Sequence, residues 1–521
     1  MTFSLRKLLV VLASIGLCLP LAAQTAESRW AHLGPDGRLI YAHSPHGDRI
    51  PDFSSAGYRG GGIAIPQVKT VLQLSPSSDP DDTPRIQKAL DEVGGRPIPA
   101  RGAVELAAGV YHLAGTLRMD KSGVVLRGSG AAGKDVTLVE MSGPPHMAVE
   151  IMGEFQQQAL SPATTLTDTY VPAGATVIHL ADASTVHPGD TLQIVKPVTP
   201  AWIHFMGMDR LSRDGSNETW LDSDLPVRRR VRAVSGDAVL LDVPLTDSFD
   251  SKFYPGIQPA VTRVQVTGQI SEVGVENLKI AAPKQTVAFR EDPEFDGLHI
   301  DRVVDAWVRA LEFEDITTPV RIERDAERMT LVNVNVIEHE SVTSRAKPFF
   351  FSVNGSQILI DRCTGNGNTV TYVGTQSRSE GPVVVLHCRF DGDGMIEGHQ
   401  RWSTGLLVDG CDIPGGSINL RNRGEMGSGH GWAIGWSVLW NNHAGSFVVQ
   451  NPPGAANWTI GDQGQQQEAP MPRPGLGKRG QPLLDGGVTA SPGKHVKPES
   501  LYLQQLRDRL GPAAVTAIGY E

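Results

Sequence analysis

Short apolar strands, each followed by a turn, recur along the second half of the chain. Three of them end alike, in the stretches "ILIDRCTG", "VVLHCRFD" and "LLVDGCDI". Their cysteines, Cys363, Cys388 and Cys411, stand 25 and 23 residues apart. The same position in further strands is occupied by Leu278, Leu311 and Val334 upstream and by Leu439 downstream. A strand repeat in the twenties, with no helical pattern between the strands, predicts a solenoid.

We therefore expect an all-β chain, a parallel β-helix whose coils stack about 4.8 Å apart. Equivalent inward-facing residues then lie on top of one another, and small apolar thiols suit such a ladder. A β-sandwich is the alternative, because its strands can also be evenly spaced. It gives no reason for side chains to repeat at a fixed register, so the pattern favours the β-helix.

The rest of the chain divides into an N-terminal cap with first coils (24–155), an inserted β subdomain (156–262), main coils (263–462) and a tail (463–521). The insert alternates like antiparallel strands joined by Gly-Asp turns. Its segment "TPAWIHFMGMDR" and Trp220 are expected to wall a cleft. The tail is rich in Gln, Gly and Pro. It ends in "PESLYLQQLRDRL", which predicts one amphipathic helix docked on the solenoid.

Composition and the N-terminus narrow the class. The chain has 57 glycines, 36 prolines and 6% aromatic residues, which is typical of many turns and short strands. Its formal charge of −10 argues against a general nucleic-acid binder. Arg6 and Lys7 precede a short apolar run, which predicts a signal peptide over 1–23 and a secreted or periplasmic protein. No other stretch is apolar enough to span a membrane. The three remaining cysteines are an odd number, which is a poor disulfide framework.

The front of the chain resembles a known superfamily. "DDTPRIQKAL" (Asp81 to Leu90) is similar to the short helix that caps a right-handed parallel β-helix. "GAVELAAGVYHLAGTLRM" and "GVVLRGSG" resemble the first coils of the pectate-lyase-like superfamily, and the resemblance covers roughly residues 50–150 and 265–460. It implies a right-handed coil. The superfamily hosts lyases, hydrolases, epimerases and phage adhesins, so the chemistry must come from the residues of the site.

Counting forward from the repeated position gives candidate site residues. Steps of ten to thirteen residues reach a basic stripe made of Arg345, Lys347, His399, Arg401, Arg421 and Arg423. Steps of nine reach Tyr372 and Glu397. Guanidinium groups pair with carboxylates in bidentate fashion, so the stripe suits an acidic polysaccharide. The alternative is a solvated ladder of charges paired with Glu397 and neighbouring acids.

The segment "LRNRGEMGSGHGW" (Leu420 to Trp432) is expected to present Arg421, Arg423 and His430 to the floor of a groove. Trp402 and Trp432 are expected to stack on sugar rings. For His430 a structural role and a catalytic role both stay open. We expect no metal or other cofactor. Calcium held by Asp391 and Asp393 is an alternative to a plain turn at that place.

The leading hypothesis is a monomeric polysaccharide lyase acting by β-elimination on a uronic-acid-containing polysaccharide. Arg421 and Arg423 would neutralise the carboxylate, and His399 would act as the base. Tyr372 or His430 would protonate the leaving oxygen. The remaining stripe residues, with Glu397, Trp402 and Trp432, would bind substrate. The calcium-binding aspartates of true pectate lyases are not evident.

Two other functions remain. "GHGWAIG" (Gly429 to Gly435) is similar to a polygalacturonase segment, which implies a glycoside hydrolase. Such enzymes also need paired aspartates one coil earlier. Here Asp409 and Asp412 are not adjacent, and no Arg-x-Lys follows. The third hypothesis is a non-catalytic carbohydrate-binding β-helix.

Overall fold

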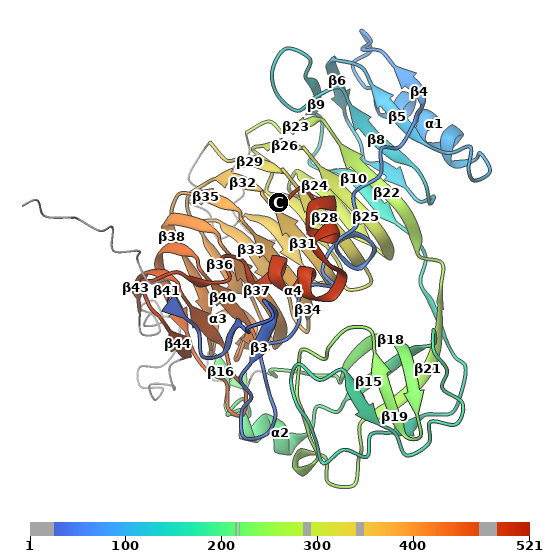
Figure 1. Cartoon of the computed structure of the whole chain (residues 1–521). Coiled ribbons are helices and arrows are strands. Elements are labelled where there is room, and N and C mark those ends of the chain that lie inside the picture. The colour runs from blue at the N-terminus through green and yellow to red at the C-terminus, as the bar shows by residue number, and fades with distance from the viewer. Residues whose placement is uncertain (1–25, 214–215, 218, 285–292, 340–347, 468–486) are drawn as a thin grey trace, which may run out of the picture.

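The computed structural model describes residues 26–213, 216–217, 219–284, 293–339, 348–467 and 487–521, and it is a right-handed parallel β-helix (Figure 1). Three parallel ladders run along it. The first contains β4 (Thr70–Leu74), β5 (Ala103–Leu106), β8 (Val125–Gly128), β22 (Ile270–Glu276), β25 (Val303–Arg309), β28 (Glu327–Val332), β31 (Ser356–Asp361), β34 (Glu380–Leu386), β37 (Ser403–Asp409), β40 (Val438–Trp440), β42 (Trp458–Ile460) and β44 (Val488–Ala490).

The other two ladders share one sheet. The second ladder contains β6 (Gly109–Leu113), β9 (Thr137–Met141), β23 (Lys279–Ala281), β26 (Glu312–Glu314), β29 (Asn335–Ile337), β32 (Thr364–Asn366), β35 (Arg389–Asp391), the start of β38 (Asp412–Leu420), the start of β41 (His443–Val449) and β43 (Gln463–Gln466). The third contains β7 (Leu117–Met119), β10 (Met147–Met152), β24 (Asp296–Asp301), β27 (Thr318–Ile322), β30 (Phe349–Val353), β33 (Thr371–Thr375), β36 (Met395–Gly398) and the ends of β38 and β41.

A repeated corner joins the first ladder to the second. In seven coils one residue at this corner has a φ between 48° and 61°, the left-handed region. These corner residues are Asn277, Ala310, Asn333, Arg362, His387, Gly410 and Asn441. The backbone N–H of each donates to a carbonyl oxygen of the next coil over 2.9–3.1 Å. The corner therefore also sets the register between coils.

The residue after each corner points into the core. This confirms the repeated position predicted from the cysteine spacing in all but one of the coils. Leu278, Leu311, Val334 and the three cysteines occupy equivalent places and are at most 2% exposed. The cysteines are free thiols. The backbone N–H of Cys388 lies 3.4 Å from Cys411 Sγ.

The downstream assignment to Leu439 was wrong. Leu439 pairs with Val408 inside the first ladder, so the position after the corner is Asn442. Its side-chain oxygen accepts a hydrogen bond from Cys411 N–H (2.9 Å), and its Nδ2 donates to Val408 O (2.9 Å). An apolar pattern cannot reveal this position, because a hydrogen-bonded amide replaces the apolar side chain there.

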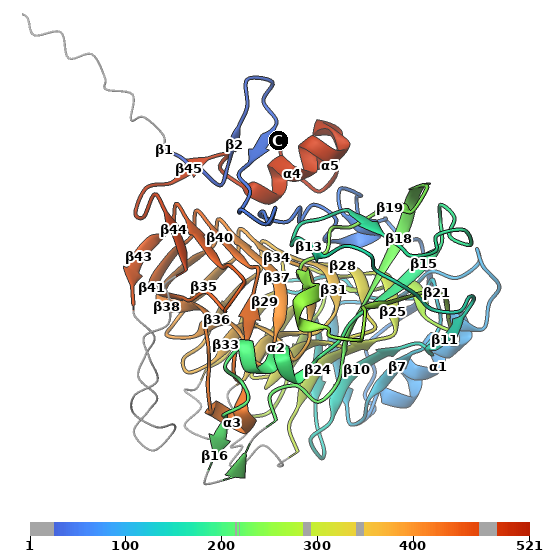
Figure 2. The same cartoon turned by 90° about the horizontal axis from the view of Figure 1, so that it is seen from below.

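The insert is an antiparallel sheet beside the solenoid (Figure 2). Its strands are β11 (Gln156–Ala159), β12 (Thr164–Thr165), β14 (Val177–His179), β15 (Thr191–Lys196), β18 (Leu225–Ser235), β19 (Ala238–Leu241) and β21 (Ala260–Thr267). Two-residue strands β13 (Tyr170–Val171) and β20 (Phe249–Asp250) pair nearby, as do β16 (Ser212–Arg213) and β17 (Ser216–Asn217). The sheet has its own core, which includes Leu192, Ile194 and Val239, each fully buried.

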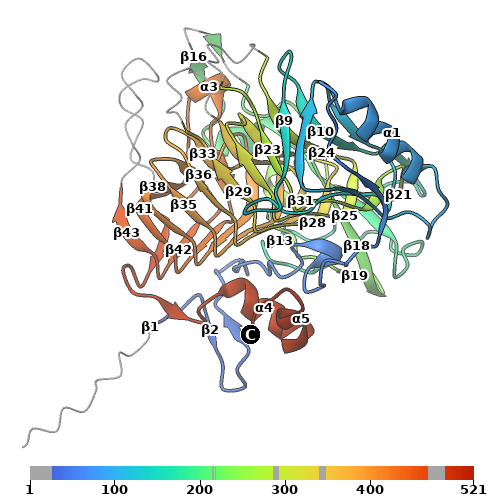
Figure 3. The same cartoon turned by 90° about the horizontal axis from the view of Figure 1, so that it is seen from above.

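Helices close the solenoid and cover its side. Helix α1 (Thr83–Gly94) packs Ile86 and Val93 against the first coils, as expected of a cap. At the C-terminus, α4 (Leu501–Leu510) and α5 (Pro512–Ala517) lie beside β2 (Ala31–Leu33) and β3 (Leu39–Tyr41) (Figure 3). Asp409 fixes the start of α4, because its carboxylate accepts from Ser500 Oγ (2.7 Å) and Tyr502 N (2.8 Å).

The fold class is therefore as expected, with two corrections at the end of the chain. The predicted tail contributes β43 and β44 to the ladders, and β45 (Val496–Lys497) pairs with β1 (Ala26–Glu27). The sequence also gave no sign of α5. The expected signal peptide, residues 1–23, lies outside the described residues. None of the helices in the described ranges is both long and apolar enough to cross a membrane.

The corner allows a direct test at Ala310. Left-handed backbone costs a residue with a Cβ about 1–2 kcal/mol. We expect Ala310→Gly to raise the free energy of unfolding by about 1 kcal/mol, less the entropy that glycine gains in the unfolded chain. Ala306→Gly, in β25, should lower it, since Ala306 is buried in an extended strand. Urea unfolding followed by tryptophan fluorescence measures both; equal destabilisation would contradict the corner's role.

Candidate functional site

The glycine-rich segment after β38 folds back on itself as a short loop. Asn422 and Trp432 form an antiparallel bridge, and Arg423 N–H donates to Gly431 O over 2.7 Å. The single turn α3 (Met426–Gly429) lies at its tip. The loop therefore holds the backbone of Arg423 close to the end of the third ladder.

Two glycines let this loop pack closely. Gly427 and Gly431 have φ values of 61° and 57°. A Cβ on Gly427 would lie 2.1 Å from Nε2 of His430, and one on Gly431 would lie 2.5 Å from the indole of Trp220. The loop thus needs glycine at both positions to cover His430, which is only 3% exposed.

Glu397, in β36, is the centre of the charged site. Its Oε1 lies 2.8 Å from Arg423 Nη1 and 3.2 Å from His399 Nδ1, and its Oε2 lies 3.5 Å from Arg421 Nη2. The His430 ring lies 5.0 Å from the His399 ring, centroid to centroid. We call these five residues the Glu397 cluster. Two guanidinium groups and one carboxylate leave it one net positive charge when both histidines are neutral.

The register of the third ladder brings the cluster together. Glu397 pairs with Asn419 of β38, so His399 and Arg421 each stand two residues beyond a paired position on neighbouring coils. The N–H of His399 continues the ladder by donating to Thr375 O over 2.8 Å. The sequence expectation that His399 lies beside Arg421 agrees with this register.

Burial and charge set the protonation of the cluster. Burial would raise the pKa of Glu397, but Arg423, His399 and Arg421 together outweigh it and lower that pKa to about 2. Burial lowers the pKa of His430 to about 3, and Arg423 and His399 add to this effect. Near neutral pH, Glu397 is therefore an anion and His430 is uncharged.

The contacts of Arg423 and Glu397 bear on the tautomer of His399. Nη1 of Arg423 carries two hydrogens and has three acceptors in reach: Glu397 Oε1 at 2.8 Å, His399 Nδ1 at 2.8 Å and the His399 carbonyl at 2.5 Å. When the two oxygens take both hydrogens, His399 Nδ1 donates its own hydrogen to Glu397 Oε1 at 3.2 Å, and Nε2 carries the lone pair that a general base requires. When Nδ1 accepts from Arg423 instead, the hydrogen lies on Nε2.

The burial of the two arginines corrects the picture of an exposed stripe. The Arg421 and Arg423 side chains are 11% and 9% exposed, and both face Glu397, which is 2% exposed. Arg401 lies at the edge, where Nη2 donates to Ser428 O over 2.6 Å. Arg345 and Lys347 lie outside the described residues.

Tyr372 does not join the cluster. A bulge between Thr371 and Val373 shifts the pairing, so the residue opposite Glu397 is Gly374. Tyr372 points into the core, fully buried, and stacks on Phe390 at 4.7 Å. Its hydroxyl donates to Gly367 O or Asp391 O, and burial raises its pKa to about 12. This placement contradicts the expected role as proton donor.

Trp402 and Trp432 are not available to stack on sugar in this groove, because they are 3% and 1% exposed. Trp402 packs against Trp202 and Trp220, and its indole N–H donates to Asp247 over 2.8 Å. Both tryptophans belong to the core between the solenoid and the insert.

The calcium alternative finds no support at "FDGDG". Asp391 is paired with Arg389 at 2.8 Å, and Asp393 accepts from the backbone N–H of Thr369 in the preceding coil. Within the described ranges, the one group with metal-like spacing is Glu314, Asp315 and His339. Lys279 already pairs with Glu314 in that group.

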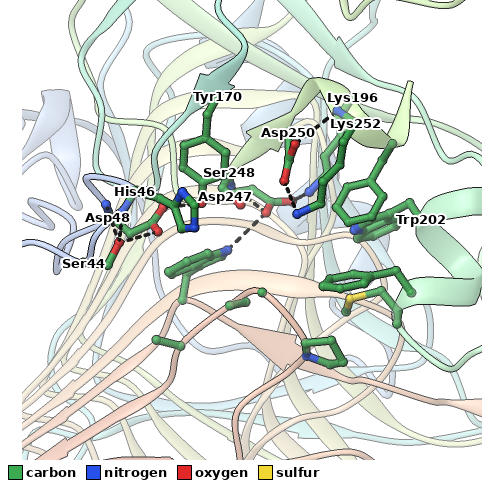
Figure 4. A pocket seen from close by; sticks show the side chains of 18 of the residues that line it. Ser44, His46, Asp48, Tyr170, Lys196, Trp202, Asp247, Ser248, Asp250 and Lys252 are labelled. Atoms are coloured by element: carbon green, nitrogen blue, oxygen red, sulfur yellow. Dashed lines mark hydrogen bonds and ion pairs between the residues drawn. The ribbon is translucent and has the colours of Figure 1, made fainter. Parts of the chain in front are cut away.

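A pocket of about 270 Å³ lies where the insert, the N-terminal segment and the last coils meet (Figure 4). Helix α2 (Pro200–Phe205) supplies Trp202 and Phe205 to its wall, so "TPAWIHFMGMDR" does wall a cleft as expected. Trp220 lies behind Trp202 instead, 5.3 Å away between ring centroids. The other walls come from distant segments, and no local pattern in the sequence marks them.

The chain matches no known family model and no curated protein sequence. Among solved structures it is similar to the tailspike of Acinetobacter baumannii bacteriophage AP22 in complex with A. baumannii capsular saccharide. That likeness has 12% identity and a TM-score of 0.38, and it covers 74% of this chain and 61% of the tailspike.

A mutant tailspike of E. coli bacteriophage HK620 in complex with pentasaccharide is also similar (10% identity, TM-score 0.38, 76% of this chain and 55% of that one). The Streptococcus pneumoniae surface protein and adhesin PfbA has 9% identity and a TM-score of 0.38, with 76% and 86% covered. The chain thus spans 55–61% of the length of these two tailspikes. These likenesses concern the fold alone.

The burial of Glu397 makes a stability prediction. Arg423→Ala leaves a buried carboxylate without its nearest cation, so we expect a loss of about 3–5 kcal/mol in the free energy of unfolding. Arg389→Ala is the control, because Arg389 also pairs with carboxylates, those of Asp391 and Asp412, but is 53% exposed; its loss should stay below about 1 kcal/mol. Urea unfolding measures both, and equal losses would contradict the burial of the cluster.

Proposed function

We propose that this chain is an exported polysaccharide lyase that cleaves a uronic-acid-containing polysaccharide by β-elimination. One observation carries the proposal: His399 is held by Glu397 beside two arginines, in a cluster with one net positive charge. Elimination needs both a base and a positive charge next to a substrate carboxylate. The apolar N-terminal run supports export.

The arginines would stabilise the carboxylate as electrons move onto it. Arg423 is bound to Glu397 and to the His399 carbonyl, whereas Arg421 meets Glu397 only at 3.5 Å. Arg421 is therefore the guanidinium that would turn to the substrate, while Arg423 positions His399.

His399 would serve as both base and acid. Its Nε2 takes the proton alpha to the carboxylate, the electron pair of that bond forms the double bond, and the glycosidic oxygen leaves. The imidazolium of His399 then returns the proton to the leaving oxygen. His430 is less suited to donate, because a neutral imidazole with a pKa of about 3 holds no proton that it readily gives up. In the proposed mechanism neither Tyr372 nor His430 supplies the acid.

The hydrolase alternative needs two carboxylates on either side of one glycosidic bond, and Asp409 and Asp412 are not placed in that way. Asp409 is fully buried under α4, and burial raises its pKa to about 7. Asp412 lies on the outer face and pairs with His443 at 2.8 Å. The two carboxylates have separate partners, so they do not flank one glycosidic bond as hydrolysis requires.

Replacement of the base tests the proposal. On uronic-acid polysaccharides the wild-type protein should release products with the ultraviolet absorbance of a double bond conjugated to a carboxylate. We expect His399→Gln to lower this turnover by about 10²–10⁴-fold, because glutamine cannot take and return a proton. His443→Gln is the matched control, since His443 is also paired with a carboxylate but is 53% exposed. Near-normal turnover by His399→Gln would contradict the proposal.

The pH profile gives an independent check. Neither Glu397 nor His430 changes charge between about pH 5 and 8, because their pKa values are about 2 and 3. The proposal therefore assigns the acid side of the rate profile to His399 as the base. We expect log kcat/KM to rise with a slope of one on the acid side. A slope of two would mean that a second group must also lose a proton.

A further inference from the structure

The insert contacts the loop that carries α3 (residues 421–432), here called the α3 loop, through the indole of Trp220. Figures 2 and 3 both show α3 beside β16 of the insert. The indole N–H of Trp220 lies 3.1 Å from the carbonyl oxygen of His430 and 3.2 Å from that of Trp432. Trp220 is 1% exposed, so these contacts are shielded from water. One donor from the insert is therefore shared by two carbonyls of the returning strand of the loop.

Met208 and Gly431 keep this contact close. The backbone N–H of Trp432 lies 3.3 Å from Sδ of Met208, which accepts it as a weak hydrogen bond. Gly431 has a φ of 57°, and a Cβ there would lie 2.5 Å from Cδ1 of Trp220 and 2.6 Å from the Met208 sulfur. The indole thus lies directly against the backbone of Gly431.

The returning strand of the α3 loop holds Arg423. The carbonyl of Gly431 accepts from Arg423 N–H over 2.7 Å. The Arg423 side chain then reaches Glu397 Oε1 at 2.8 Å and the His399 carbonyl at 2.5 Å. A shift of residues 430–432 would therefore move the guanidinium that contacts His399.

The solenoid holds the same strand from the next coil. The carbonyls of His430 and Trp432 also accept from the backbone N–H groups of Arg401 (3.1 Å) and Trp402 (2.9 Å). Each carbonyl oxygen has two lone pairs, so both of its donors can be satisfied. The loop therefore stays folded without the indole N–H, whereas its position depends on both sets of contacts.

We infer that Trp220 is a positioning residue for the proposed elimination. Its indole N–H fixes the strand that contains Gly431, and this strand fixes Arg423 beside His399. The inference rests on the proposed function, because it gives the insert a part in that same site. A misplacement of about 1 Å in an active site can cost about a hundredfold in rate, so a contact that never touches the substrate can control turnover.

Trp220→Phe tests this inference, since phenylalanine keeps an aromatic ring but has no N–H. On a uronic-acid polysaccharide we expect kcat to fall about tenfold to a hundredfold with KM little changed. Trp440→Phe is the matched control, because that indole is also buried and its N–H also donates to a backbone carbonyl, Pro498 O at 2.9 Å. It should lower stability and leave kcat unchanged. Equal kcat in the two variants would overturn the inference.

Gly431→Ala acts on the same contact from the side of the loop. Its Cβ would press on Trp220, so kcat should fall, and the double variant should lose less than the product of the two single losses. Gly236→Ala is the matched control, because Gly236 also has a positive φ (64°) but nothing lies within 4 Å of its Cβ position. It should leave kcat unchanged. Fully multiplicative losses would overturn the inference, because the two residues would then act separately.

The pH profile separates positioning from a loss of folded protein, which cannot move the profile. In Trp220→Phe the positive charge of Arg423 lies less close to His399, so the base takes up a proton more readily. The acid side of the profile should therefore move to higher pH. A lower kcat with an unmoved profile would overturn the inference.

Hydrogen exchange keeps this inference apart from the proposed function, because it needs no substrate. The peptide that spans residues 420–432 should exchange about fivefold to tenfold faster in Trp220→Phe than in the wild type or Trp440→Phe, through loss of one hydrogen bond. Faster exchange in a chain without lyase activity would support the role of Trp220 in fixing the loop and contradict only the elimination. Unchanged exchange would overturn the inference, whatever turnover is measured.

Discussion

The left-handed corner between the first and second ladders is the constraint on which the rest of this structure depends. Residues with a Cβ occupy it in six of seven coils, at a cost of about 1–2 kcal/mol each. The backbone hydrogen bond that each corner makes to the next coil offsets this cost. Because the corner fixes the register of each coil against the next, residues at the end of the third ladder in successive coils lie side by side. Glu397 and Arg421 are neighbours for this reason.

The sequence correctly predicted the positions that follow the regular repeat of the coils. The predictions were wrong where the repeat is interrupted. The cysteines marked the core positions after the corner, and counting from them placed His399 beside Arg421. The count failed at Tyr372, because a one-residue bulge cannot be seen in an apolar pattern. It failed at Leu439 because a hydrogen-bonded Asn442 takes the next position.

Burial was the harder property to predict. Charged residues among glycines indicate an exposed loop, and Arg421 and Arg423 were expected to be presented to the floor of an open groove. Glu397, the carboxylate that both arginines face inside the protein, lies more than twenty residues earlier in the chain. The pairing therefore forms only when the coils stack, and no local sequence pattern indicates it. The pocket lined by α2 was even harder to predict from the sequence. Trp30, Lys196, Tyr254 and Trp458 approach only after the insert and the N-terminal segment dock on the solenoid.

The Glu397 cluster links stability to the proposed chemistry. One carboxylate contacts both His399 and Arg423 and keeps them in place, so the groups that would act on a uronate are arranged before substrate arrives. The most direct test is proton NMR of the products that the wild-type chain forms from a uronic-acid polysaccharide. The account predicts the vinyl proton of an unsaturated uronate at each new non-reducing end. Saturated products with new reducing ends would contradict it, because they would mark hydrolysis.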